Sequence, residues 1–136
     1  MSNCQQRSEI SVKNKYYISR LRYLELKNFC LQYKDWKLAL KEITLIKAHE
    51  EINKSSSISD PTNQMAVKRL KYEENISLIE ETAIVSDPSI AKWIIKGVTE
   101  GYTYEYLHLQ MDLPAGRDLY YDRYRRFFWL LDKRRQ

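Results

Sequence analysis

The last twenty residues of the chain hold the side chains whose types and spacing are best suited to chemistry. Residues 117–136 carry seven basic residues against three acidic ones, and they are rich in aromatic residues. Guanidinium groups donate hydrogen bonds to phosphates and guanine edges, and short acids accept from cytosine amino groups. We therefore predict that DNA bases are contacted by Arg117, Asp118, Tyr121 and Arg123. We predict that phosphates are contacted by Arg125, Arg126, Lys133, Arg134 and Arg135.

The spacing of the aromatic residues predicts that this segment is a helix from Arg117 to about Arg134. Its apolar side chains recur at three- and four-residue steps, as expected for a face turned to the core: Tyr120, Tyr124, Phe127, Phe128 and Leu131. Arg117 and Tyr121 are four residues apart and share another face, so we expect Tyr121 to be the exposed aromatic residue. A last helix packed inside the molecule, with its guanidinium groups engaged by neighbouring carboxylates, would contradict these base contacts.

A helix enters the major groove productively only if a partner helix supports it and a short turn fixes its angle. Upstream of Arg117, apolar spacing predicts short helices over 88–99 and 103–112, with Gly101 as a left-handed cap between them. The segment LPAG, residues 113–116, predicts a turn, because Pro114 removes a backbone donor. Three short helices with a tight turn before the last predict a helix-turn-helix domain over 87–136.

The rest of the chain predicts longer helices. Apolar residues recur at helical spacing over 13–50, with a phase shift near Asn28 that allows a kink or break there. Polar residues 51–60 predict a loop, and Asp60-Pro61 predicts the start of a helix that runs to about residue 85. The predicted fold is all-α, with about five helices and a possible antiparallel pair. Its predicted divisions are 1–59, 60–86 and 87–136.

The charges are distributed unevenly along the chain. The net charge is +5, with +6 over residues 1–48, −5 over residues 49–116 and +4 over residues 117–136. Two basic ends around an acidic middle favour a polyanionic partner, but solvated lysine-rich helix surface explains the same pattern. Charge alone leaves both interpretations open.

Several classes of protein are disfavoured. Three scattered glycines do not form a phosphate-cradling loop, and no residue pair predicts a catalytic site, so we expect no enzyme and no cofactor. Cys4, Cys30, His49 and His108 lack the spacing of metal ligands, so we expect no metal. There is no run of about 18 apolar residues and no apolar leader at the start, so we expect no membrane span and no secretion.

The C-terminal third also resembles a known group of proteins. The strings GYTYEYL, LPAGRD and YYDRYRRFFWLL, together with SISDPTNQMAVKR upstream, are similar to small prophage-encoded transcriptional regulators of Firmicutes. These are loosely related to the RinA and ArpU groups of phage late-gene activators, and their C-terminal domain resembles the helix-turn-helix of sigma factors. The resemblance covers residues 55–136 and implies a double-stranded-DNA-binding activator of late genes. Tyr120 and Tyr124 depart from the branched apolar residues usual in sigma-like domains, which leaves the register of the base contacts open.

Two other functions fit the same sequence. A small terminase subunit also joins a helix-turn-helix to long oligomerising helices, and residues 13–85 are suited to a homo-oligomer. A helical adaptor that binds RNA polymerase is suggested by the acidic segment 73–87. A large closed ring in solution would favour packaging, whereas a monomer or dimer would favour regulation. In each case we expect a location in the bacterial cytoplasm, and for the regulator at the nucleoid.

Overall fold

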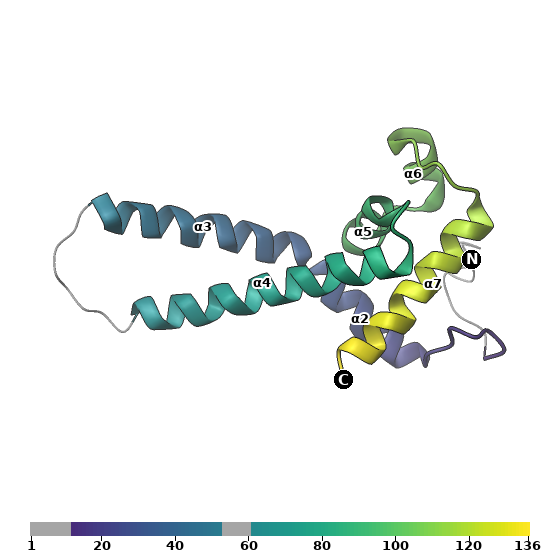
Figure 1. Ribbon diagram of the computed structural model, residues 1–136, viewed down its shortest axis with the longest axis horizontal. Coiled ribbons are helices and arrows are strands. Elements are labelled where there is room, and N and C mark those ends of the chain that lie inside the picture. Colours follow the sequence, from purple (N-terminus) through teal and green to yellow (C-terminus); the bar gives the residue numbers. More distant parts are fainter. Residues whose placement is uncertain (1–11, 53–60) are drawn as a thin grey trace. The chain divides into compact units, whose positions relative to one another are not determined.

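The computed structural model describes residues 12–52 and 61–136, in which every regular element is a helix. The fold is therefore all-α, as predicted. Six helices follow one another in these residues (Figure 1): α2 (Arg20–Leu31), α3 (Tyr33–Ile52), α4 (Pro61–Ser86), α5 (Ala91–Glu100), α6 (Tyr104–Met111) and α7 (Arg117–Arg134).

The backbone divides into two compact units. Among the described residues, the first combines 12–32 with 78–136, and the second consists of 33–52 and 61–77. This division does not follow the predicted ranges 1–59, 60–86 and 87–136. The reason is that α2 contacts α5 and α7, so an N-terminal helix is part of the unit that holds the C-terminal helices.

The region predicted as one helix from Lys13 to Glu50 holds two helices, α2 and α3, and residues 13–19 before them are turns and irregular chain. Ser19 caps α2, because its side-chain oxygen accepts a hydrogen bond from the backbone N–H of Arg22 at 3.3 Å. The backbone N–H of Gln32 bonds to the carbonyl of Phe29 at 3.2 Å, which tightens the last turn of α2. The break therefore lies four residues beyond the phase shift at Asn28.

The core of the first unit is built on the inward face of α7. Six of its side chains are buried: Tyr120, Tyr121, Tyr124, Phe127, Phe128 and Leu131. From α2, the hydroxyl of Tyr23 shares a hydrogen bond of 2.9 Å with that of Tyr124, and the Tyr23 ring meets Phe128 edge-on at 5.0 Å. The aromatic spacing of the last helix is thus a packing pattern, and the buried hydroxyls of this pair satisfy each other.

In the second unit, α3 and the first part of α4 run antiparallel (Figure 1). The possible antiparallel pair is therefore present. Its first helix is α3 alone and not the whole predicted helix over 13–50. Helix α4 begins at Pro61, as predicted, while its predicted cap Asp60 lies outside the described residues. Of the predicted loop 51–60, Glu51 and Ile52 belong to α3, and the rest lies outside the described residues.

Candidate nucleic-acid interface

Helix α6 and the connection after it fix the start of α7. Thr103 caps α6 by accepting a hydrogen bond from the backbone N–H of Tyr106 at 3.2 Å. At its end Asp112 adopts a left-handed backbone with φ of 56°, a conformation that Asp tolerates better than most residues. The next N–H, of Leu113, donates to the carbonyl of Leu107 at 3.1 Å, and the Leu113 side chain is buried. The connection between α6 and α7 is therefore only five residues long, 112–116, and is anchored at its first two residues.

Two side chains tie this connection to its surroundings. The indole N–H of Trp93, on α5, donates to the carbonyl of Met111 at 2.7 Å. The hydroxyl of Tyr104 donates to the carbonyl of Ala115 at 2.9 Å. Met111 stands at the end of α6 and Ala115 in the turn, where backbone carbonyls have no partner within a helix. These two side chains supply the missing hydrogen bonds. A helix, a short anchored turn and a second helix thus occur where the sequence predicted them.

The predicted base-contacting residue Arg117 is held at the start of α7 by α6. Its guanidinium group forms an ion pair with Glu105, which stands in the first turn of α6. The same guanidinium lies 5.9 Å from the ring centre of Tyr104 and 5.6 Å from that of Tyr121. Its side chain is 29 % exposed, so one edge still faces solvent.

Arg123 is bound by two carboxylates. Its Nε lies 3.1 Å from Asp87, between α4 and α5, and its Nη1 lies 2.5 Å from Asp122. Burial opposes ionisation of Asp87, but hydrogen bonds from Ser89 and the charge of Arg123 outweigh it and lower the pKa of this carboxyl. The hydroxyl of Ser86 also donates to the backbone carbonyl of Arg123 at 2.7 Å. Arg123 therefore links α7 to the end of α4.

The prediction that Tyr121 is exposed was wrong. Its side chain is buried among Tyr104, Tyr120 and Tyr124, whose ring centres lie 5.2–6.5 Å away. Tyrosine is amphipathic, so helical spacing alone does not tell whether its ring faces water or a second aromatic cluster. Of the four predicted base contacts, Asp118 alone is exposed, and its neighbour Leu119 is exposed as well.

The predicted phosphate contacts lie on the second half of α7 and after it. Arg125 and Arg126 are half-buried, whereas Lys133, Arg134 and Arg135 are exposed. Two of these cations rest on aromatic rings: Lys133 Nζ lies 4.4 Å from the ring centre of Trp129, and the Arg135 guanidinium lies 3.8 Å from that of Phe29. An aromatic face attracts a cation without neutralising its charge, so these groups stay available to anions.

The first unit also carries cations that the sequence analysis did not predict as DNA contacts. Arg22, on α2, bonds to Asp132 at 2.7 Å and to the backbone carbonyl of Arg135, which brings the start of α2 beside the basic end of α7. On α5, Lys92 and Lys96 are exposed. Their four-residue spacing off the apolar stripe was the available sign of a shared outer face. No sequence signal linked Arg22 to a helix so distant in the chain.

Other kinds of site are not found in the described residues. No group of three or more His, Cys, Asp or Glu side chains in 12–52 and 61–136 is arranged to hold a metal ion. Cys30 is buried, and burial raises the pKa of its thiol, while Cys4 lies outside the described residues. None of the described helices is both long enough and apolar enough to cross a membrane.

The chain was compared with models of protein families, with curated proteins and with solved structures. None of the three comparisons finds a match.

Proposed function

We propose that the protein is a sequence-specific double-stranded-DNA-binding transcription regulator of phage type that activates late genes. The observation that supports this most is the arrangement of α6, the anchored turn and α7, whose cations are half-buried or exposed: Arg117, Arg123, Arg125, Arg126, Lys133 and Arg134. A helix-turn-helix protein needs this combination of rigid support and outward donors. Such a regulator acts in the bacterial cytoplasm at the nucleoid, and RNA polymerase is its expected partner at a promoter.

The internal ion pairs hold the two arginines proposed for base contacts differently. The side chains of Arg117 and Glu105 are 29 % and 44 % exposed, and an ion pair with this much exposure contributes about 0–1 kcal/mol. A phosphate or a guanine edge can therefore replace Glu105 at small cost, and Glu105 meanwhile holds Arg117 in place. Arg123 pairs with Asp122, which is 33 % exposed, and with Asp87, which is only 14 % exposed. Only its contact with Asp122 is exposed enough to be replaced in the same way.

We assign the two halves of α7 different tasks. Its first half, with Arg117, Asp118 and Arg123, is the part proposed to read bases. Its second half, with Arg126 and Lys133, is proposed to bind phosphates, which positions the helix without reading sequence. Tyr121 is removed from the predicted base contacts, because a buried ring does not reach a groove.

The test is fluorescence anisotropy with duplexes selected from a random pool and with shuffled versions of the same duplexes. Specific binding should be roughly 10³-fold tighter or more for the selected duplexes at physiological salt. Equal affinity for both would refute the regulator. Arg126→Ala should weaken binding to both duplexes and flatten the salt dependence by about one unit. Lys71→Ala, which removes an exposed cation of the other unit, is the matched control and should change neither.

A further inference from the structure

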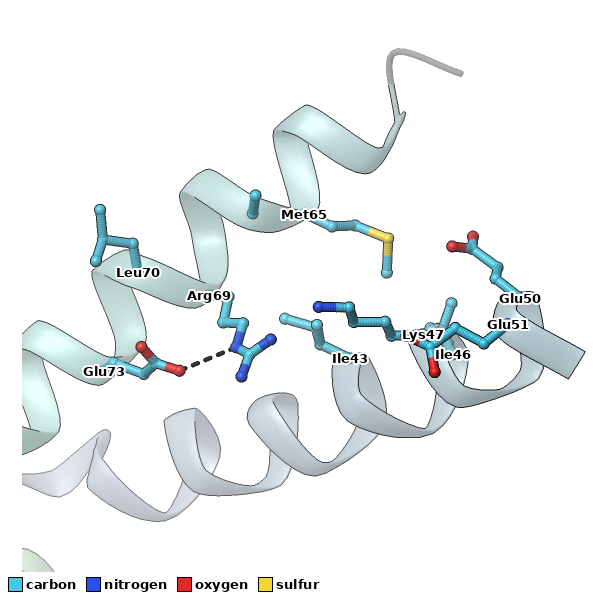
Figure 2. Close-up of a pocket in the computed structure, with 10 residues that line it drawn as sticks. Ile43, Ile46, Lys47, Glu50, Glu51, Met65, Arg69, Leu70 and Glu73 are labelled. Atoms are coloured by element: carbon cyan, nitrogen blue, oxygen red, sulfur yellow. Dashed lines mark hydrogen bonds and ion pairs between the residues drawn. The ribbon is translucent and has the colours of Figure 1, made fainter. Parts of the chain in front are cut away.

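The helical pair of the second unit contains an open groove that the proposed DNA interface does not use. Its volume is about 530 Å³, and it lies between α3 and the first part of α4. Figure 2 shows Ile43, Ile46 and Lys47 rising from α3 toward Met65 and Arg69 of α4. All the residues that line the groove belong to one compact unit.

The groove is apolar at its centre yet poorly covered. Ile43 and Met65 are half-buried, while the side chains of Ile46 and Leu70 are 44 % and 57 % exposed. A small ligand would stay largely in solvent here, whereas ligand pockets bury about 70–90 % of a ligand's surface. Two helices alone do not form a layered core, so the apolar face of this pair calls for another helical layer.

The charges at the groove indicate what that layer is. Lys47 and Arg69 stand with three acids, Glu50, Glu51 and Glu73, and Arg69 bonds to Glu73 at 3.0 Å on the same helix. The three carboxylates repel a polyanion such as DNA, and the two cations oppose a lysine-rich peptide. A surface that presents both signs side by side is complementary to its own copy, turned by a two-fold axis.

We propose that the groove between α3 and α4 is covered by the same groove of a second copy of the chain. The two helical pairs then form an antiparallel four-helix bundle around the apolar groups of Ile43, Ile46, Met65 and Leu70. Lys47 and Arg69 of one copy approach the acids of the other. Such an isologous contact gives a closed dimer, which is the commonest symmetric assembly of soluble proteins. This inference does not depend on DNA binding, and its tests contain no DNA.

The first test is sedimentation equilibrium of the full chain and of two matched variants. Ile46→Glu places a charge in the groove, whereas Leu45→Glu places it at a neighbouring side chain that is 70 % exposed and does not line the groove. The parent chain should have twice the mass of one chain. Ile46→Glu should raise the dimer Kd about 30-fold or more, a change typical of a central interface residue. Leu45→Glu should leave the Kd within about threefold.

Both sites are already partly exposed in one copy, so circular dichroism should find the same helix content in both variants. A parent chain that stays a monomer at 100 µM, on the order of ordinary biophysical samples, overturns the proposal. The same conclusion follows if a ring of many subunits forms, or if Leu45→Glu separates the copies while Ile46→Glu does not.

The second test concerns charge. The double change Glu50→Lys and Glu51→Lys leaves the α3 side of the groove with cations only, so two copies should repel each other and the Kd should rise tenfold or more, about one decade for each 1.4 kcal/mol. Glu42→Lys changes an exposed acid of α3 that does not line the groove, and it should have little effect. Equal Kd values for the double variant and the control would contradict the pairing through this groove.

Discussion

Replacing Gly97 by Ala should destabilise the first unit, although alanine is the better helix former. Gly97 lies within α5, where this change alone favours the helix by about 1 kcal/mol. A Cβ at this position would lie 2.0 Å from the hydroxyl oxygen of Tyr120. Tyr120 is 1 % exposed, so its ring can relieve the overlap only by shifting within the core, toward a hollow of about 130 Å³ that Gly97 and Tyr120 both line. Overpacking in a core costs about 1–3 kcal/mol, and an overlap this large belongs at the upper end. The expected net loss is about 2 kcal/mol.

A double-mutant cycle with Tyr120→Phe isolates this overlap. Without the hydroxyl, the closest ring atom lies 3.4 Å from the added Cβ, an ordinary contact. No described residue offers the Tyr120 hydroxyl a hydrogen bond, so its removal should cost little or even stabilise the protein. In the Tyr120→Phe background, Gly97→Ala should therefore be neutral or stabilising. The expected coupling is about 2 kcal/mol or more.

The free energies come from urea unfolding, followed by circular dichroism and tryptophan fluorescence. Because the chain has two compact units, the two signals must coincide before a single free energy is assigned. If Gly97→Ala is as stable as the parent chain, or equally harmful in the Tyr120→Phe background, the close approach of α5 and α7 is not as described.

Three further predictions follow from single contacts. Asp87→Asn should reduce the loss of unfolding free energy at acid pH. The lowered pKa of Asp87 contributes stability that is present at neutral pH and is lost as the pH falls below about 4. Urea unfolding between pH 2 and 7 measures this, and an unchanged pH dependence would contradict the contact with Arg123. Asp112→Gly should raise the unfolding free energy by up to about 1 kcal/mol, because glycine adopts a positive φ without strain; a loss would argue against the left-handed turn. Glu105→Gln should tighten binding to shuffled DNA severalfold, because it removes the carboxylate that competes for Arg117; anisotropy measures this, and weaker binding would count against the interface.

Local signals in the sequence predicted the elements near the candidate site well. Gly101 has the predicted left-handed backbone at the end of α5, and α7 runs from Arg117 to Arg134 as expected. Both depend on residues whose backbone preferences are intrinsic, or on an aromatic face repeated along the whole helix. The turn over 113–116 is likewise local, since Pro114 and Gly116 act on their own neighbours.

The break between α2 and α3 is signalled only by the phase shift of the apolar stripe near Asn28, which does not fix its position. Neither Gly nor Pro stands near Gln32, and the chain is helical on both sides of it. What separates the helices is tertiary: α2 packs with α5 and α7 in the first unit, whereas α3 belongs to the second unit, where it lines a groove with the first part of α4. Tyr121 shows the same limit, because its burial depends on Tyr104, which belongs to another helix. The pairing of Arg123 with Asp87 likewise joins residues far apart in the sequence.

The cations at the start and at the end of α7 have different contacts, and these contacts suggest which of them DNA would meet first. Arg117 and Arg123 are held by carboxylates, so an anion must displace an internal partner before it binds there. Lys133 and Arg135 rest on aromatic rings that leave their charge unneutralised, so a phosphate need not displace a carboxylate of the described residues there. Contact with any DNA should therefore begin at the end of α7. In the proposed function, a matching sequence would be recognised only where the gain at a base edge exceeds the small cost of opening the Arg117–Glu105 ion pair at the start of α7. The internal acids would then sharpen specificity, because they compete with weak contacts and yield to strong ones.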